Sequence, residues 1–357
     1  MRPTRALTRR GTAALAALAS TSCLFLAACS GDEDTPAADP TSSSSAPAEQ
    51  DVAEGTTLDA TWPLTGLTVR NGTADKKYPV MVTKIDNTSS SAPQRGLGSA
   101  DMVVEELVEG GYTRLAVFFY STMPDLVGPV RSMRASDIGI VGPADANVVT
   151  SGAANVTINR IDKAGITWFT EGDKGFFRDS ARYSPYNLMD RLDETVTLAR
   201  TDKAARPDDY LPFGEMKENP KGAKAVGLAA GFGTHVTQWS YSSQSRTYSN
   251  VNGYAADGDE FDADSVLVLR VQVGDAGYRD PAGNYVPETK FTGTGQAMLF
   301  HGGRVVRGTW NKKSLESNLT LSTGQGKKKR DLVVPAGHTW IELVPADTGS
   351  VSITAKR

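Results

Sequence analysis

Arginines at the ends of predicted strands are the residues of this chain best suited to chemistry. Arg114 opens the apolar run 115–120, and the segment Gly128-Pro129-Val130-Arg131-Ser132-Met133-Arg134 brings two more to the start of an expected helix. Guanidinium groups and the free N–H groups of a helix N-terminus both favour phosphate or carboxylate. The pattern therefore predicts an anion site.

The spacing of Arg131 and Arg134 adds a requirement for negative charge. On a helix, two arginines three residues apart share a face and repel each other. A negatively charged group is therefore expected between them. Two sources of that charge remain open: an internal carboxylate, from Glu105 or Glu109, and an external ligand held in a cleft.

Other polar residues extend the predicted site. Asp86 and Asn87 end a strand-like run, where Asx residues often only close a turn. The loop 177–182 again combines two guanidiniums with a carboxylate, and Asn187 either joins it or caps the next helix. The expected ligand-binding residues are Arg114, Arg131, Arg134, Arg178, Arg182, Asn187, Asp86, Asn87, Asp101 and Glu105.

Sparse histidine and cysteine restrict the chemistry further. Cys23 and Cys29 are the two cysteines, and the three histidines all lie beyond residue 234. A site built from the first half must therefore use arginine electrostatics, carboxylates or an oxygen-ligated hard cation rather than a serine triad or zinc. His301 and His338 lack ligand spacing, so no metal site is expected from them.

Charge distribution argues against nucleic acid as a partner. The first 28 residues carry four arginines and no acid, whereas residues 30–55 are acidic and carry no base. From residue 56 onward, acidic and basic residues are equal in number. A folded region without a basic footprint is not expected to bind DNA or RNA.

The N-terminus predicts export and lipid anchoring. Basic residues 1–10 precede the uncharged run 11–28, the layout of an export signal. Leu26-Ala27-Ala28-Cys29 resembles the bacterial lipobox, which favours a lipoprotein over a transmembrane span. The resemblance implies lipidation of Cys29 and an anchored position on the extracytoplasmic face of the cell membrane. Thr8-Arg9-Arg10 leaves the Sec and twin-arginine export routes both open.

Two folded domains are expected after a disordered acidic tether over 29–55, which is rich in Ser, Pro and Ala. Within 56–222, helical spacing at 135–141, 155–164 and 188–204 is interspersed with strand-like runs at 78–86, 102–108, 115–120 and 147–151. Within 223–357, strand candidates lie at 236–241, 247–251, 265–273, 297–301, 304–310, 319–322, 332–334 and 339–344. The predicted fold class is α+β: a layered α/β domain with a mixed sheet, followed by a smaller β-rich domain.

Two further features of the second half have structural interpretations. Trp310 and Trp340 are expected in the core, because a β-domain of this size needs large aromatics inside. The basic run 327–330 is expected to tip a hairpin, either as a solvated turn or as a contact for a wall polyanion or anionic lipid.

Motifs along both halves resemble the YerB-like family of bacterial lipoproteins, which have two domains and no established function. They include Pro63-Leu64-Thr65-Gly66, Ile85-Asp86-Asn87, Glu109-Gly110-Gly111, Gly128-Pro129-Val130-Arg131-Ser132, Pro185-Tyr186-Asn187-Leu188, Gly293-Thr294-Gly295-Gln296-Ala297 and Gly337-His338-Thr339-Trp340-Ile341. The resemblance covers nearly all of the chain after the tether. It implies family membership and brings no activity with it.

A looser likeness to LytR-CpsA-Psr enzymes adds an enzymatic hypothesis. Those enzymes move glycopolymers from polyprenyl pyrophosphate carriers onto the cell wall. The likeness would place Asp86 and Asp101 on magnesium, and Arg131 and Arg134 on the pyrophosphate. Their Pro-Arg-Asp motif is replaced here by Pro129-Val130-Arg131-Ser132, which adds a residue and lacks the acid.

Two functions are therefore weighed. The first is a lipid-anchored envelope protein that binds an anionic ligand, with a cell-wall polymer or an envelope protein as its expected partner. The second is a transferase that acts on a polyprenyl-pyrophosphate wall precursor. No cofactor is expected except magnesium in the transferase.

Overall fold

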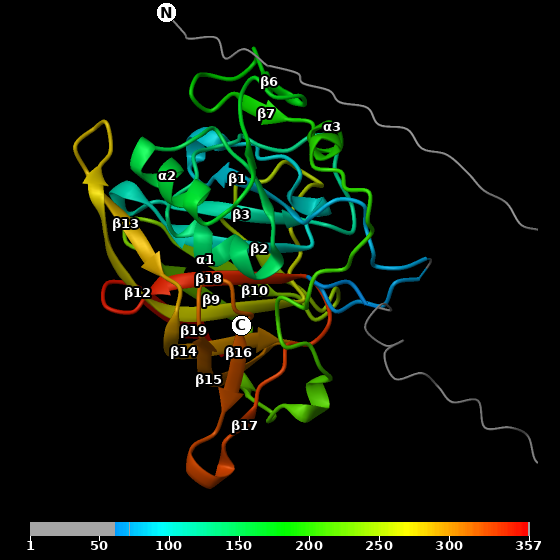
Figure 1. Cartoon of the computed structure of the whole chain (residues 1–357). Coiled ribbons are helices and arrows are strands. Elements are labelled where there is room, and N and C mark those ends of the chain that lie inside the picture. The colour runs from blue at the N-terminus through cyan, green and yellow to red at the C-terminus, as the bar shows by residue number, and fades with distance from the viewer. Residues whose placement is uncertain (1–60, 71, 356–357) are drawn as a thin grey trace, which may run out of the picture. The chain divides into compact units, whose positions relative to one another are not determined.

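The computed structural model describes residues 61–355 except residue 71 (Figure 1). The predicted export signal, Cys29 and the tether lie outside the described residues. Strands dominate and helices are few, which is consistent with the α+β class at a lower helix content than expected. No helix within 61–355 is long and apolar enough to cross a membrane.

The larger sheet mixes parallel and antiparallel pairs and, in the described part of the chain, has 13 strands. In spatial order they are β17 (Arg330–Asp331), β16 (Thr320–Thr323), β15 (Arg304–Lys312), β14 (Gly293–His301), β12 (Ser265–Arg279), β18 (Thr339–Pro345), β2 (Met102–Leu107), β3 (Thr113–Phe119), β1 (Met81–Asp86), β4 (Asn147–Val149) and β5 (Trp168–Phe169), with β13 (Tyr285–Lys290) beside β12 and β8 (Ala223–Lys224) beside β15. β18 is parallel to both of its neighbours, β12 and β2. The sheet therefore continues across the boundary expected at residue 222.

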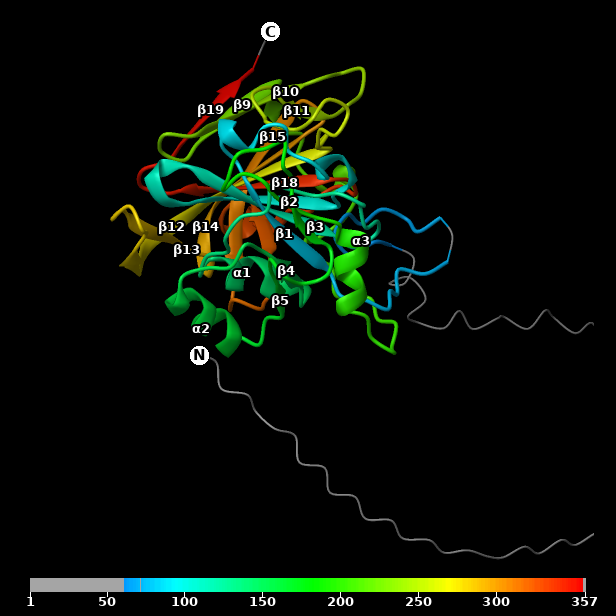
Figure 2. The same ribbon diagram turned by 90° about the horizontal axis from the view of Figure 1, so that it is seen from above.

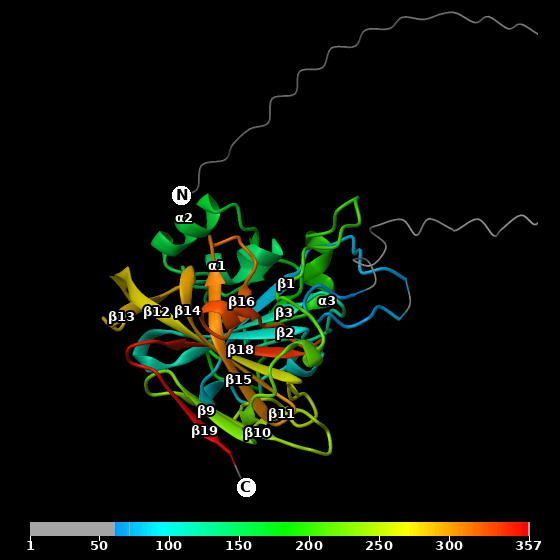
Figure 3. The same cartoon turned by 90° about the horizontal axis from the view of Figure 1, so that it is seen from below.

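Each face of this sheet has a different cover. A smaller antiparallel sheet of β11 (Tyr248–Asn250), β10 (Val236–Tyr241), β9 (Gly227–Gly231) and β19 (Ser350–Thr354) lies on one face. Helices α1 (Asp137–Val141) and α2 (Asn155–Lys163) lie on the other, and Figures 2 and 3 show this layering from opposite sides. Since side chains alternate along a strand, the central strands supply two separate apolar cores.

Several expected elements are confirmed and two are wrong. The helix predicted over 188–204 is instead a short strand, β7 (Leu188–Asp190), followed by α3 (Leu192–Thr195) and a 3-10 turn. Leu188–Asp190 cannot be helical because it pairs with β6 (Phe176–Arg178). The strand predicted at 332–334 reduces to one bridge between Val334 and Phe213.

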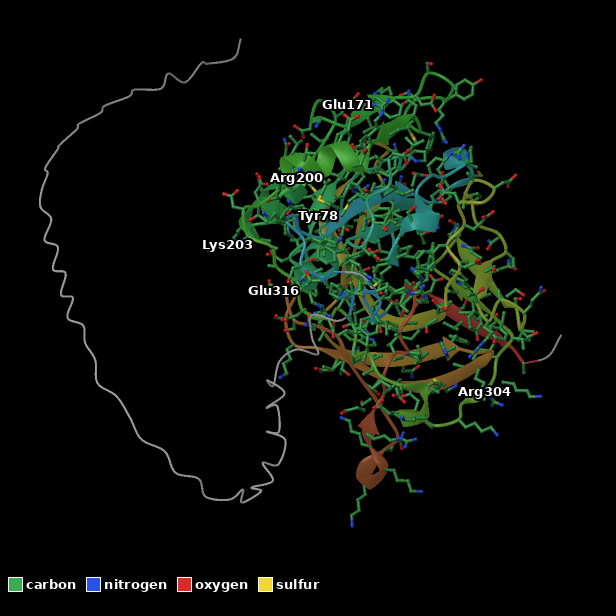
Figure 4. All side chains as sticks on the ribbon, turned by 90° about the vertical axis from the view of Figure 1, so that its right-hand side faces the viewer. Tyr78, Glu171, Arg200, Lys203, Arg304 and Glu316 are labelled. Atoms are coloured by element: carbon green, nitrogen blue, oxygen red, sulfur yellow. The ribbon has the colours of Figure 1, made fainter. Side chains whose placement is uncertain are left out.

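The expectations for the second half's aromatic and basic residues are confirmed in their placement. Trp310 and Trp340 are both buried. The basic run 327–330 lies exposed between β16 and β17, where Figure 4 shows nitrogen-tipped side chains extending from the hairpin.

A buried charge cluster joins the central sheet to α1. Lys84 Nζ lies 2.7 Å from both Glu106 Oε1 and Asp137 Oδ1, and all three side chains are buried. Burial opposes ionisation of Lys84, but the carboxylates of Asp137 and Glu106 outweigh it and raise the pKa of the ammonium. The cluster therefore keeps its charged lysine on the helix-covered face.

Replacing Lys84 with Met should strongly destabilise the protein. The change leaves two buried carboxylates without a cation, and removal of one member of such a cluster typically lowers the free energy of unfolding by about 3–5 kcal/mol. Denaturant unfolding measures this loss. Lys203→Met is the control, because Lys203 is exposed (Figure 4). A loss below about 1 kcal/mol for Lys84→Met would contradict the assignment.

Asp190, in β7, should make stability depend on pH. Burial, followed by the nearby charges of Asp193 and Glu194, raises the pKa of Asp190 to about 7. Its Oδ1 accepts a hydrogen bond from Thr195, and its Oδ2 has no partner among the described residues. Between about pH 4 and pH 7 the folded protein therefore holds a proton that the unfolded chain releases.

The stabilisation that this Asp190 proton gives the folded state is complete at low pH, and it is lost as pH rises through about 7. Asp190→Asn should thus raise the free energy of unfolding at pH 8 by about 2 kcal/mol and change it little at pH 4.5. Melting temperatures at both pH values measure the difference. The exposed Asp208→Asn is the matched control, and an equal effect of Asp190→Asn at both pH values would refute the prediction.

Candidate functional site

An open cavity of about 570 Å³ lies where β1 ends and β3 begins. Asp86 and Arg114 face each other across these antiparallel strands, so both come to the same end of the sheet. We call this space the arginine cavity. Its lining is Asp86, Asn87, Thr88, Ser89, Ser90, Val108, Glu109, Tyr112, Thr113, Arg114, Arg131, Ser132, Arg134, Tyr186, Thr234, His235, Tyr254, Asp280 and Pro281.

Arg131 is held at the cavity by Asp86. Its Nε donates to Asp86 Oδ2 at 3.1 Å, and its guanidinium lies 5.1 Å from the centre of the Tyr186 ring. The other oxygen of Asp86 accepts the backbone N–H of Thr88 at 3.0 Å, which closes the turn after β1. Asp86 therefore acts both as a turn residue and as an internal counter-ion.

Arg134 is fixed by an internal carboxylate. Its Nε and Nη2 donate to the two oxygens of Glu109, each at 2.8 Å, and Nη1 donates to the Met133 carbonyl. Burial alone would raise the pKa of Glu109, but the hydrogen bonds and charge of Arg134 lower it. Of the two sources of negative charge left open for this arginine, the internal one is present, and it is Glu109 rather than Glu105.

Arg114 differs from its two neighbours because no carboxylate pairs with it within the described chain. It is 7% exposed; Nη1 donates to the Ser132 carbonyl at 2.8 Å, and the buried Nε has no partner among residues 61–355. Burial, and then the positive charge of Arg134, lower its pKa to about 10. Arg114 is therefore a buried cation beside an open cavity, with two arginine–carboxylate pairs nearby and its hydrogen-bonding capacity only partly used.

A buried polar network forms the floor of the cavity. Glu105 Oε1 accepts hydrogen bonds from Asn87 Nδ2 at 3.1 Å and from Thr237 Oγ1 at 2.8 Å, and it lies 3.3 Å from His235 Nε2. Although burial acts to raise it, the hydrogen bond and charge of His235 lower the pKa of Glu105. Asn87 and His235 thus line the cavity, and Glu105 lies buried behind them with its oxygens already paired inside the protein.

A second carboxyl group backs this network. Glu342 of β18 lies directly beside Glu105 of β2 in the parallel register. Its Oε1 accepts the indole N–H of Trp239 at 2.7 Å, and its buried Oε2 has no partner among the described residues. Burial and the negative charge of Glu105 raise the pKa of Glu342 well above its ordinary value, which favours its protonated form.

Asp101 lies far from this cavity. It precedes the pairing of Met102 with Phe118, whereas Asp86 pairs with Arg114, so the two carboxylates are separated by roughly 15 Å along the strands. Asp101 accepts the backbone N–H groups of Tyr120 and Ser121. The pairing of Asp86 and Asp101 on one magnesium is therefore contradicted by the register. Nowhere between residues 61 and 355 do three His, Cys, Asp or Glu side chains gather as a metal site.

The second arginine loop also lies outside the arginine cavity. Arg178 forms two hydrogen bonds of 2.6 Å with Glu171 and one of 2.7 Å with Asn187, all on the exposed surface (Glu171 is labelled in Figure 4). Asn187 therefore holds Arg178 and caps no helix there. Arg182 donates to the carbonyls of Ser91 and Pro93 and lines a neighbouring cavity.

His235 is the main site residue that the sequence analysis missed. It lies in the turn between β9 and β10, and its backbone N–H and that of Thr234 both donate to the Gly111 carbonyl. Gly111 has φ +76°, and a Cβ there would meet Thr234 N at 2.8 Å. The Gly-Gly turn after β2 indicated in the sequence that another backbone segment comes close to it. Nothing in the sequence identified that segment as the turn that carries His235.

Comparison with known proteins places both halves of the chain in one family. Residues 64–205 match the model described as "Protein of unknown function (DUF3048) N-terminal domain", and residues 228–341 match its C-terminal domain. These matches fall on either side of residue 222.

A curated relative and a solved structure agree with the family models. The "Putative lipoprotein YerB" of Bacillus subtilis (strain 168) is 24% identical over 299 residues, or 81% of this chain and 88% of the relative. The crystal structure of Bacillus subtilis YerB has a TM-score of 0.67 and 22% identity, covering 82% of this chain and 99% of that one, so the fold is shared. The chain therefore belongs to the YerB-like family, whose two domains have no known function.

Proposed function

We propose that the arginine cavity binds an anionic ligand, bearing phosphate or carboxylate, on the outside of the cell. The observation that carries the proposal is Arg114, a buried guanidinium that lacks a carboxylate partner in the described chain. A buried charge without a partner is unfavourable, and an anion in the cavity would relieve it.

The neighbouring charges favour a site that is already in place before the ligand arrives. Arg131 and Arg134 are each held by an internal carboxylate, so their side chains keep their positions in the empty cavity. Because Asp86 and Glu109 offset their charges, they contribute guanidinium groups fixed in position beside Arg114 rather than a net positive charge. Asp280, at the turn of the β12–β13 hairpin, contributes one negative charge to the lining, which limits the site to a compact anion close to Arg114.

Position in the cell is part of the same proposal. The lipobox-like segment before Cys29 and the lipoprotein name of the Bacillus relative both support a lipid anchor. We infer that the cavity faces the cell envelope, where phosphate- and carboxylate-bearing polymers or proteins are the available partners.

Anion binding is tested with the purified full chain, phosphate, pyrophosphate and acetate as probes, and calorimetry as the measurement. Binding should also raise the melting temperature, since a ligand that binds only the folded state stabilises it. Arg114→Gln should weaken binding at least 10-fold, by loss of a charge-assisted hydrogen bond worth about 1.5–3 kcal/mol. Phosphate binding that exceeds acetate binding would assign the ligand to the phosphate class.

Two variants keep the test interpretable. Arg114→Lys retains the charge and loses the planar fork, so it should bind with intermediate affinity if Arg114→Gln does not fold. Arg178→Gln is the control, because it makes the same change at an arginine that lies outside the cavity and is held by Glu171. Absence of binding by all three probes, or equal affinity of folded Arg114→Gln and wild type, would refute the proposal. Repeating each titration with Mg²⁺ shows whether pyrophosphate binding needs the metal, as the transferase hypothesis requires.

A further inference from the structure

Two further cavities adjoin the arginine cavity, and each shares part of its wall. A cavity of about 610 Å³ shares Ser90 and Tyr186 with it, and one of about 440 Å³ shares Asn87 and Tyr254. We call the first the tyrosine cavity and the second the acidic cavity. Because their walls are shared, a ligand longer than a single phosphate in the arginine cavity can reach either of them.

The tyrosine cavity offers an unused aromatic face. Tyr183 is 91% exposed, so burial of its ring adds almost nothing to folding. Tyr186, beside it, is stacked by Arg131. Arg95 and Arg182 also line this cavity. Exposed aromatic rings with polar neighbours are typical of surfaces that bind a partly apolar, partly polar ligand.

The acidic cavity has the opposite charge. Its lining includes the exposed carboxylates of Asp257, Glu260 and Asp262, together with hydroxyl and amide groups from Ser249 and Asn250. These acids repel phosphate and accept hydrogen bonds from hydroxyl or amino groups. A ligand with negative charges along its whole length therefore does not fit all three cavities.

On the basis of the proposed function, we propose that the ligand is a glycan chain that carries a phosphate group. The phosphate lies in the arginine cavity beside Arg114. Sugar rings extend from the phosphate to stack on Tyr183 in the tyrosine cavity and to donate hydroxyl or amino hydrogens to the acidic cavity. The different charges of the three adjoining cavities and the exposed tyrosine ring together favour this ligand over a simple anion or a polyanion.

The test compares ligands of increasing length on the full chain. The probes are inorganic phosphate, a monosaccharide phosphate, a tetrasaccharide with one internal phosphate, and the same tetrasaccharide without phosphate. The phosphorylated tetrasaccharide should bind at least 10-fold more tightly than inorganic phosphate. Tyr183→Ala should remove most of that gain and leave the affinity for inorganic phosphate unchanged.

Controls separate this inference from the proposed function. Tyr183→Phe keeps the ring and should keep the gain, and Leu198→Ala removes an exposed apolar side chain outside the three cavities and should also keep it. If inorganic phosphate binds but affinity does not rise with chain length, or Tyr183→Ala has no effect, the glycan inference is overturned and the anion site stands. If acetate, inorganic phosphate and every phosphorylated probe all fail to bind, the proposed function itself fails. An equal gain from a phosphorylated tetrapeptide would reassign the ligand to a peptide and also overturn the glycan inference.

Discussion

Two adjacent carboxylates on a strand buried on both faces set the main constraint on this structure. Glu105 and Glu106 follow each other on β2, so they point to opposite sides of the large sheet, and both are fully buried. Burying a carboxylate is strongly unfavourable unless a cation or several donors meet it. The polar residues on both faces of the sheet are arranged to meet that requirement.

On the helix-covered face of the sheet, a lysine pairs with the buried carboxylate of Glu106. On the other face, neutral and weakly basic donors surround the buried carboxylate of Glu105. Lys84 meets Glu106, and α1 adds Asp137 to the same ammonium. Glu105 instead collects Asn87, Thr237 and His235, which draws the end of β1 and the β9–β10 turn together. The floor of the arginine cavity thus follows from the need to satisfy one buried glutamate.

The three arginines of the cavity differ in whether an internal carboxylate pairs with them. That difference distinguishes a structural ion-pair network from a binding site. Arg131 and Arg134 have counter-ions of their own, and they would be explained by structure alone. Arg114 is as deeply buried as Arg134 but has no carboxylate partner in the described chain. A network that served only stability would be expected to pair every buried cation.

Sequence patterns predicted the strands that build this end of the sheet, because their apolar runs are long and sharply bounded. They also placed Arg114, Arg131 and Arg134 together, since consecutive strands tend to be neighbours and each arginine stands at a strand end. They failed for Asp101, which lies at the other end of its strand, and for the helix expected over 188–204, where pairing with β6 overrides helical spacing. They also missed β9 and β19, whose small or polar residues form strands only against the larger sheet.

His235 could not be predicted, because contact between the turn at 109–111 and the β9–β10 turn depends on how the second sheet covers the first. Local periodicity carries no information on which loop approaches which. The charge of Glu105 was visible in the sequence, but its burial, and therefore its need for distant donors, was not.

The central position of β18 has a consequence for how the chain reaches this fold. The ribosome releases residue 102 long before residue 345, yet β2 has β3 on one edge and β18 on the other. Until β18 is in place, β2 presents a bare row of amide and carbonyl groups that other strands can join. A truncation before Thr339 would therefore expose an aggregation-prone edge at the middle of the sheet rather than remove a peripheral domain.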